Sequence, residues 1–104
     1  MSGRNAAAKG LPDSNHIEIV EAYEELFCSV VDTHGQGGGF PDLVCGIAGV
    51  TCLVEIKTEA GQLEASQIRF QRDWRGSKVT VVRTRADVIN HVQNVRERVS
   101  RSKS

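Results

Sequence analysis

Two carboxylates and one ammonium, those of Asp42, Glu55 and Lys57, have the spacing in this sequence that best suits a catalytic role. Asp42 follows a proline, and the segment Glu55-Ile56-Lys57 begins thirteen residues later. Residues 51–57 have the apolar composition of a buried strand, in which side chains alternate between the two faces. Glu55 and Lys57 therefore share a face, where burying charged groups is unfavourable unless they are paired or used.

The two acids are predicted to face each other across a hairpin. Residues 42–47 and 50–57 have strand composition, and Ala48-Gly49 between them is a tight turn. Asp42 stands six residues before Ala48 and Glu55 six residues after Gly49, so the pairing count places them opposite one another. Two such carboxylates repel each other, and a hard divalent cation between them removes the repulsion.

The predicted cation is Mg²⁺, with Mn²⁺ as a substitute. Magnesium takes oxygen ligands and keeps several waters, and in that state it polarises a phosphoryl oxygen and supplies a hydroxide nucleophile. The carbonyl of Ile56 is a further candidate ligand at the end of the strand. Lys57 is expected to hold the attacking water or to balance the charge of a phosphate.

The remaining elements must position these groups. A helix is expected over residues 14–27, with Ile17, Val20, Tyr23 or Glu24, and Phe27 recurring at helical spacing. A strand over 28–33 and a mobile glycine-rich turn over 34–39 precede the hairpin. After it come a polar connection over 58–63, a helix over 64–75 that Gly76 caps, a strand over 78–84 and a helix over 86–99. In the second helix Ala65, Ile68 and Trp74 are expected to point inward.

This order, α-β-β-β-α-β-α, predicts an α/β fold with a mixed β-sheet flanked by helices. The 104 residues suit one domain, over residues 13–99, with a flexible leader at 1–12 and a frayed basic tail at 100–104. No apolar run is long enough for a membrane helix, and no secretory signal is evident. We interpret Cys28, Cys45 and Cys52 as core residues of a cytoplasmic protein.

Charge is divided unevenly along a chain whose net charge is zero. Residues 1–54 carry two bases and seven acids, whereas residues 58–104 carry ten bases and five acids. The second half can therefore present a basic surface to an anionic polymer, and Arg69, Arg72 and Lys78 are the candidate phosphate contacts. The alternative is an ordinary solvated helix face.

The glycine run after His34 is not a nucleotide-phosphate loop, because no Gly-Lys-Ser/Thr ends it and a strand follows where a helix should. It is either a flexible connection or a loop, centred on Gly38, that lets a DNA backbone approach closely. His34 beside it is a candidate phosphate contact or simply a polar loop residue. His16, His34 and His91 are too scattered in sequence to suggest a zinc site.

The motif Pro41-Asp42 followed by Glu55-Ile56-Lys57 resembles that of the PD-(D/E)xK nuclease superfamily, and the predicted element order is similar to its restriction-endonuclease-like core. Within it the chain looks like the small VRR-NUC and Holliday-junction-resolvase-like branch. The glycine-rich approach over residues 37–42 and a glutamate in the first helix favour that branch. So does Gln67, which matches a glutamine near the catalytic site of relatives.

The resemblance covers residues 13–90 and implies roles residue by residue. Asp42 and Glu55 match the metal-binding acids, and Lys57 matches the catalytic lysine. Glu18 is the expected metal ligand from the first helix, because residues 15–18 resemble that branch's opening. Glu21, one turn further along, is the alternative.

The function that this resemblance implies is Mg²⁺-dependent DNA endonuclease activity on branched or four-way-junction DNA. Relatives of this size act as homodimers, which suits cleavage of two strands. The resemblance also implies that the protein works in the cytoplasm of a bacterial or phage-infected host cell. One alternative is a catalytically inactive nucleic-acid-binding module of the same fold. Another is a metal-binding regulator without a role on DNA.

Overall fold

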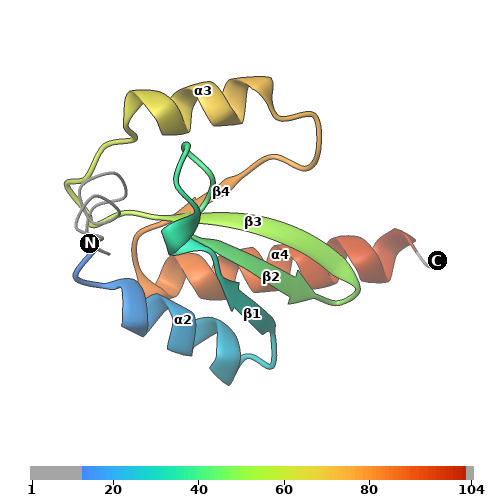
Figure 1. Ribbon diagram of the computed structural model, residues 1–104. Helices are drawn as coiled ribbons and strands as arrows, with labels where there is room; N and C mark the ends of the chain where they lie inside the picture. Colours follow the sequence, from blue (N-terminus) through green and yellow to red (C-terminus); the bar gives the residue numbers. More distant parts are fainter. Residues whose placement is uncertain (1–12, 103–104) are drawn as a thin grey trace.

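The computed structural model describes residues 13–102, which form a four-stranded sheet with three helices (Figure 1). The predicted α/β class with a mixed sheet is confirmed. Along the chain the elements are α2 (His16–Glu25), β1 (Ser29–Asp32), the 3-10 turn η1 (His34–Gln36), β2 (Leu43–Ile47), β3 (Val50–Ile56), α3 (Ala65–Asp73), β4 (Thr80–Val82) and α4 (Arg85–Ser102).

The sheet has the strand order β1-β2-β3-β4. The first two pairings are antiparallel, and β3 and β4 pair in parallel, with α3 on the crossover that a parallel pair requires. In the central hairpin Leu43 pairs with Val54 and Ile47 with Val50, which is the register that the turn predicted. Ala48 and Gly49 turn the chain with φ values of 52° and 81°, the left-handed conformations that a two-residue hairpin turn needs.

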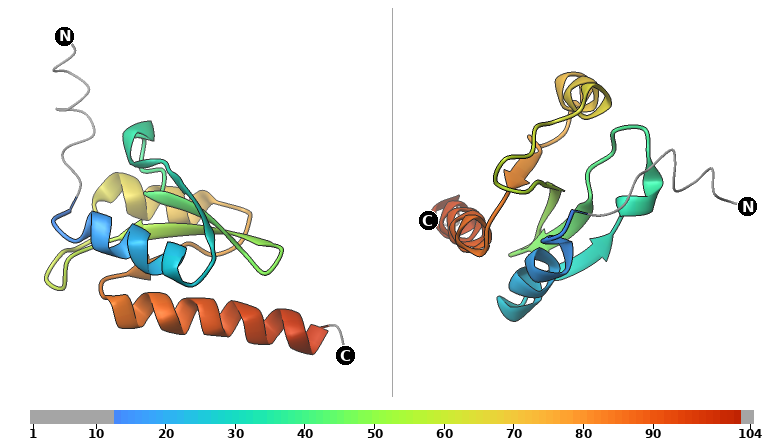
Figure 2. Two further views of the ribbon diagram at one scale, coloured as in Figure 1. Left: turned by 90° about the horizontal axis from the view of Figure 1, so that it is seen from below. Right: turned by 90° about the vertical axis from the view of Figure 1, so that its left-hand side faces the viewer.

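The apolar core lies on one face of the sheet, under α2 and α4, while α3 lies on the opposite side (Figures 1 and 2). Cys52, Val54 and Ile56 of β3 point into this core, so the predicted alternation of that strand holds. All three cysteines are free and buried, as expected, and burial raises the pKa of Cys45 to about 12. A thiol in that state is a poor nucleophile at neutral pH.

Side-chain hydrogen bonds join the elements to one another. The Asn15 side-chain amide donates to the carbonyls of Lys57 and Arg83, joining the start of α2 to the ends of β3 and β4. The Arg83 guanidinium donates to the carbonyls of Thr58 and Gly61, both at 2.7 Å, and so holds the connection after β3. In the core, the Tyr23 hydroxyl contacts the Nδ1 atom of His91 at 2.7 Å.

The predicted inward face of the first helix was right for Tyr23, which is fully buried, and wrong at its two ends. Ile17 is 71% exposed and Phe27 is 92% exposed, while His16 and Ile19 are buried and Val20 packs partly buried against the core. The helix begins at His16, two residues later than predicted, and its buried stripe is rotated by one residue from the expected one. Phe27 has already left the helix, with φ at 65°, and therefore points away from the core.

The inward residues predicted for the second helix were also wrong. None of the residues of α3 is buried, and Ile68 and Trp74 are 53% and 43% exposed. The helix ends at Asp73 with Trp74 in an extended conformation as its C-cap, so Gly76 does not cap it. The strand that follows is shorter than predicted, three residues instead of seven.

Two further segments differ from their predictions. Residues 34–36 form one turn of 3-10 helix instead of irregular structure, and α4 continues to Ser102, so residues 100–102 are helical and not a frayed tail. The expected leader at 1–12 and the last two residues lie outside the described part. Between residues 13 and 102, no helix is long and apolar enough to cross a membrane.

Candidate active site

Glu55 is a buried carboxylate on the face of the sheet opposite the main core. It is the penultimate residue of β3, and its side chain points towards α3, away from the face that carries Val54 and Ile56. Only 1% of Glu55 is exposed. Burial, followed by the neighbouring Asp42 carboxylate, raises the pKa of Glu55 to about 9, and the attraction of Lys57 offsets only part of that increase.

Asp42 stands directly before β2, on the strand that pairs with β3. Because Leu43 pairs with Val54, the register continues to place Asp42 opposite Glu55, and the two carboxyl groups interact closely enough to raise the pKa of Glu55. The Asp42 Oδ2 atom accepts a hydrogen bond of 2.8 Å from the backbone N–H of Ile56. This bond anchors Asp42 to the end of β3. The backbone N–H of Ile56 is thus bonded to Asp42. The role of the Ile56 carbonyl as a metal ligand stays a prediction.

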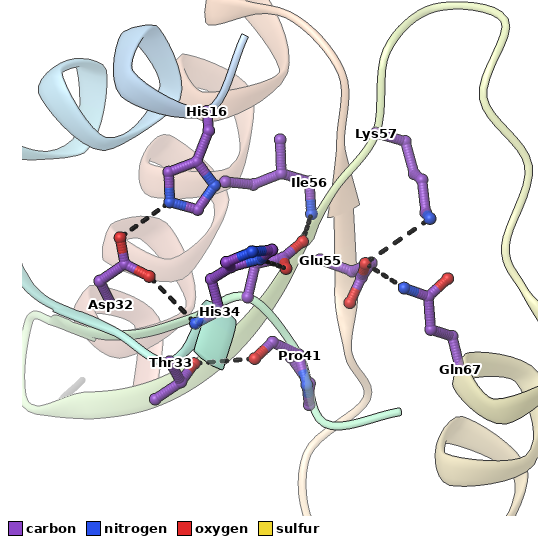
Figure 3. Close-up of polar contacts among 10 residues, drawn as sticks. His16, Asp32, Thr33, His34, Pro41, Glu55, Ile56, Lys57 and Gln67 are labelled. Atoms are coloured by element: carbon purple, nitrogen blue, oxygen red, sulfur yellow. Dashed lines mark hydrogen bonds and ion pairs between the residues drawn. The ribbon is translucent and has the colours of Figure 1, made fainter. Parts of the chain in front are cut away.

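Lys57 and Gln67 approach the Glu55 carboxylate from two elements (Figure 3). The Lys57 Nζ atom lies 3.9 Å from Glu55 Oε2, and Lys57 itself is 8% exposed. The Gln67 side-chain amide of α3 donates to the same Oε2 atom at 2.8 Å. Its oxygen accepts from the Glu64 N–H and so completes a capping box at the start of α3. Gln67 therefore couples the position of α3 to the orientation of Glu55.

A second polar cluster, formed by His16, Asp32 and His34 (Figure 3), reaches Asp42 through His34. The His34 Nδ1 atom lies 3.5 Å from Asp42 Oδ1, and the His34 backbone N–H donates to Asp32 at 3.0 Å. The other Asp32 oxygen contacts His16 Nε2 at 2.8 Å. Burial alone would raise the pKa of Asp32, but the hydrogen bonds from His34 and His16 lower it below its ordinary value.

No pattern in the sequence predicts this cluster. His16 and His34 are too scattered in sequence to suggest a zinc site, but their rings meet edge to face with centroids 5.6 Å apart. The contact of His16 with Asp32 joins two residues whose separation of sixteen matches no local period. His34 was predicted as a phosphate contact, and the structure places it half-buried against Asp42.

The glycine loop packs against the start of α3. Gly39 has φ at +83°, and a Cβ atom there would lie 2.2 Å from the Ser66 carbonyl oxygen. Gly38 has φ at +69° and open space around its Cα atom. The loop is thus fitted to α3 at Gly39, while Gly38 is the exposed point that a DNA backbone would have to approach.

The structure does not bring the predicted first-helix acids to this site. Glu18 is 59% exposed, and its Oε2 atom lies 4.0 Å from Arg85 at the start of α4. Glu21, the alternative, is exposed on α2. Instead, Asp13 just before the helix is close enough to Glu55 to contribute to its raised pKa.

The three basic residues predicted to bind DNA are exposed. Arg69 and Arg72 lie on α3, and Lys78 lies between α3 and β4. Arg72 forms two contacts of 2.8 and 3.0 Å with Asp73, which neutralises part of its charge. Arg69 lies one helical turn before the same Asp73, and its positive charge also helps to lower the pKa of that carboxyl group.

Asp42 and Glu55 suit a magnesium site that water and substrate complete, and do not form a site in which the protein supplies every ligand. Within residues 13–102, no three or more histidine, cysteine or acidic side chains gather closely enough to hold a metal by themselves. Magnesium is commonly bound by one or two carboxylates, with waters and substrate phosphates completing its shell. A cation beside Glu55 would also relieve the repulsion from Asp42 that raises the pKa of the buried carboxyl group.

A pocket of about 790 Å³ lies elsewhere, over β4 and α4. Its lining combines bases such as Arg98 and Arg101 with acids such as Asp87 and Glu97, and contains none of Asp42, Glu55, Lys57 and Gln67. Arg83, which also lines it, is already bonded to backbone carbonyls. This pocket lacks converging groups of one charge, so we place the candidate chemistry at Glu55.

No family model matches the chain, and neither a curated protein nor a solved structure matches it.

Proposed function

We propose that this protein is a Mg²⁺-dependent DNA endonuclease of the PD-(D/E)xK type that cleaves branched DNA. The observation that carries the proposal is the placement of Asp42 opposite the buried Glu55 by the hairpin register, with Lys57 beside them. Binding alone would not require a buried carboxyl group beside a second acid, an arrangement that is unfavourable without a cation. The resemblance of the motif and its spacing supports the same conclusion.

In this proposal Asp42, Glu55 and the Ile56 carbonyl hold the ion, which when bound polarises the scissile phosphate and activates water. Lys57 contributes a buried ammonium next to Glu55, where it can orient the attacking water and balance phosphate charge. Gln67 is a positioning residue, because its bond to Glu55 fixes the carboxylate that faces the reaction. His34, backed by Asp32, restrains Asp42 in the same way.

A cleavage assay tests the proposal. Purified protein is incubated with a labelled four-way junction, a flapped duplex and a matched linear duplex, each with Mg²⁺ and with Mn²⁺. Wild type should cut branched DNA in a metal-dependent manner, and Asp42→Ala should lose at least about a hundredfold in rate, as expected for a residue that holds the catalytic ion. Glu24→Ala, an exposed acid of α2, is the matched control and should cut like wild type.

Absence of cutting by wild type on every substrate with either metal would refute the enzyme. If the protein still bound DNA with a salt-dependent affinity, the result would favour the inactive nucleic-acid-binding module. Sedimentation of the same preparations tests the proposed homodimer, in which two copies would present two sites to two strands.

A further inference from the structure

An aromatic cluster lies beside the candidate active site, at the C-terminal end of α3. Phe70 and Trp74 stack with ring centroids 5.2 Å apart and planes 18° apart. Phe40, which ends the glycine loop, meets Phe70 edge to face at 5.4 Å. Trp74 remains 43% exposed. The indole is thus supported by a second ring but partly open to solvent, on the side of the sheet opposite the main core.

The cluster lines a shallow pocket of about 370 Å³. One wall is Gly38 of the glycine loop, and the other is the face of α3 that carries Arg69, Phe70 and Trp74. Asp73 completes the lining but is already paired with Arg72. Gly76 follows closely, and a Cβ atom there would lie 2.6 Å from the indole Nε1 of Trp74. The backbone at Gly76 and the Phe70 ring thus hold the indole in place.

One helix, α3, connects this pocket to the candidate active site. Gln67, which bonds to Glu55, precedes Phe70 by three residues and Trp74 by seven, so all three lie on one side of α3. At about 1.5 Å per residue, the Cα atom of Trp74, the C-cap of α3, lies roughly 10 Å along the helix axis from that of Gln67. Because stacked nucleotides repeat at about 3.4 Å, this distance corresponds to about three nucleotides along a strand.

The chemistry of the pocket fits a nucleobase with its phosphate. A flat indole stacked on a second ring offers an apolar surface to a base, and the Arg69 guanidinium beside it offers positive charge to the backbone. Arg75 and Lys78 follow in the next segment and are both exposed. A base within a duplex has both faces covered by its neighbours, so only an unpaired base can use such a surface.

We propose that Trp74, stacked on Phe70, is a platform for an unpaired base about three nucleotides from the cleaved phosphate. This inference rests on the proposed nuclease function and narrows its substrate. The protein would act on branched DNA with single-stranded nucleotides beside the cut, such as a flap, in preference to a fully paired four-way junction. Arg69 would contact the phosphate next to the stacked base.

Binding without metal tests the platform separately from cleavage. The probe is a flapped duplex whose single strand carries thymines, compared with one of equal length and charge that carries abasic sites, both in EDTA. Trp74 is the only tryptophan of the chain, so its fluorescence reports stacking directly. Wild type should be quenched by the thymine flap and should bind it roughly 5- to 150-fold more tightly than the abasic flap, the range that one stacked base supplies.

Variants on α3 complete the experiment. Trp74→Leu should abolish the preference for thymine, Trp74→Phe should keep most of it, and Ile68→Ala, which alters another exposed apolar residue of the helix, should leave it unchanged. Circular dichroism confirms that each variant folds. Equal affinity of wild type for the two flaps, or a preference that survives in Trp74→Leu, would overturn the platform.

Other results separate the two proposals. If the thymine preference is present but no substrate is cut, the platform stands and the nuclease fails. If cutting depends on Asp42 but the preference is absent, only the platform fails. If Trp74→Leu converts a dimer to a monomer in sedimentation while wild type binds both flaps equally, the aromatic surface is a contact between two copies and the platform is wrong.

Discussion

Replacing Glu55 with glutamine should stabilise the metal-free protein at neutral pH while removing its activity. Glu55 is buried beside Asp42, and its pKa is raised from 4.5 to about 9 in the folded chain. Between these values the folded state keeps a proton that the unfolded chain has released. Stability therefore falls as the pH rises, because the unfolded state binds fewer protons than the folded state. A neutral glutamine has no such dependence.

The magnitude follows from the width of this interval. One proton difference changes the free energy of unfolding by up to about 1.4 kcal/mol per pH unit. Between pH 5.5 and pH 7.5, wild type should thus lose up to about 3 kcal/mol relative to Glu55→Gln, a large part of the 5–15 kcal/mol that is typical of a domain. Gln67 can still donate to a glutamine oxygen at this position, so the packing of α3 is retained.

Urea unfolding in EDTA at several pH values measures the effect. Glu59→Gln is the matched control, because it makes the same chemical change at an exposed position four residues later, and its curve should run parallel to that of wild type. Mg²⁺ should raise the stability of wild type more at pH 7.5 than at pH 5.5, since the ion binds the ionised carboxylate, and should affect Glu55→Gln little. Parallel curves for wild type and Glu55→Gln across the range would refute the reasoning, because Glu55 would then be ionised in the folded protein.

Two further predictions concern the frame of the site. Gly39→Ala should lose at least about 1 kcal/mol more stability than Gly38→Ala in urea unfolding. Both positions have positive φ, but only a Cβ at Gly39 meets the Ser66 carbonyl. Equal losses for the two variants would contradict the close fit of Gly39 to α3. Tyr23→Phe should lower the free energy of unfolding by roughly 1–2 kcal/mol, since it leaves the buried Nδ1 atom of His91 without its 2.7 Å partner. Thr80→Val, which removes the weaker 3.3 Å contact to the same ring, should cost less, and the reverse order would show that this network does not stabilise the core.

The substrate proposal and the stability predictions depend on different parts of the molecule. In the proposed mechanism, cleavage would depend on Asp42 and Glu55 at the ends of the hairpin strands, and base recognition would depend on Trp74 at the end of α3. Gln67 joins the two, because it bonds to Glu55 and begins the side of the helix that ends at Trp74. Loss of Gln67 is therefore expected to affect both cleavage and the orientation of the platform.

The amino-acid sequence by itself determined the hairpin and the central pair of acids. A two-residue turn at Ala48-Gly49 sets which residues are paired, and strand alternation then decides which face each side chain takes, so Asp42 and Glu55 were predictable from local geometry. The burial of the cysteines was predictable for a similar reason, because they lie within short apolar runs. These features depend on neighbours in the chain.

Only the tertiary structure decided which side of each helix is buried and which helix residues lie near the candidate active site. A helix with apolar residues on several sides can bury more than one stripe, and packing against the sheet and α4 selected Ile19 and Tyr23 over Ile17. That same rotation directs Glu18 to Arg85 and brings His16 to Asp32. On α3 the sheet offers little apolar surface, because its facing side carries Glu55 and Lys57, so Trp74 remains at the surface. Such contacts join residues distant in the sequence, and no local spacing encodes them.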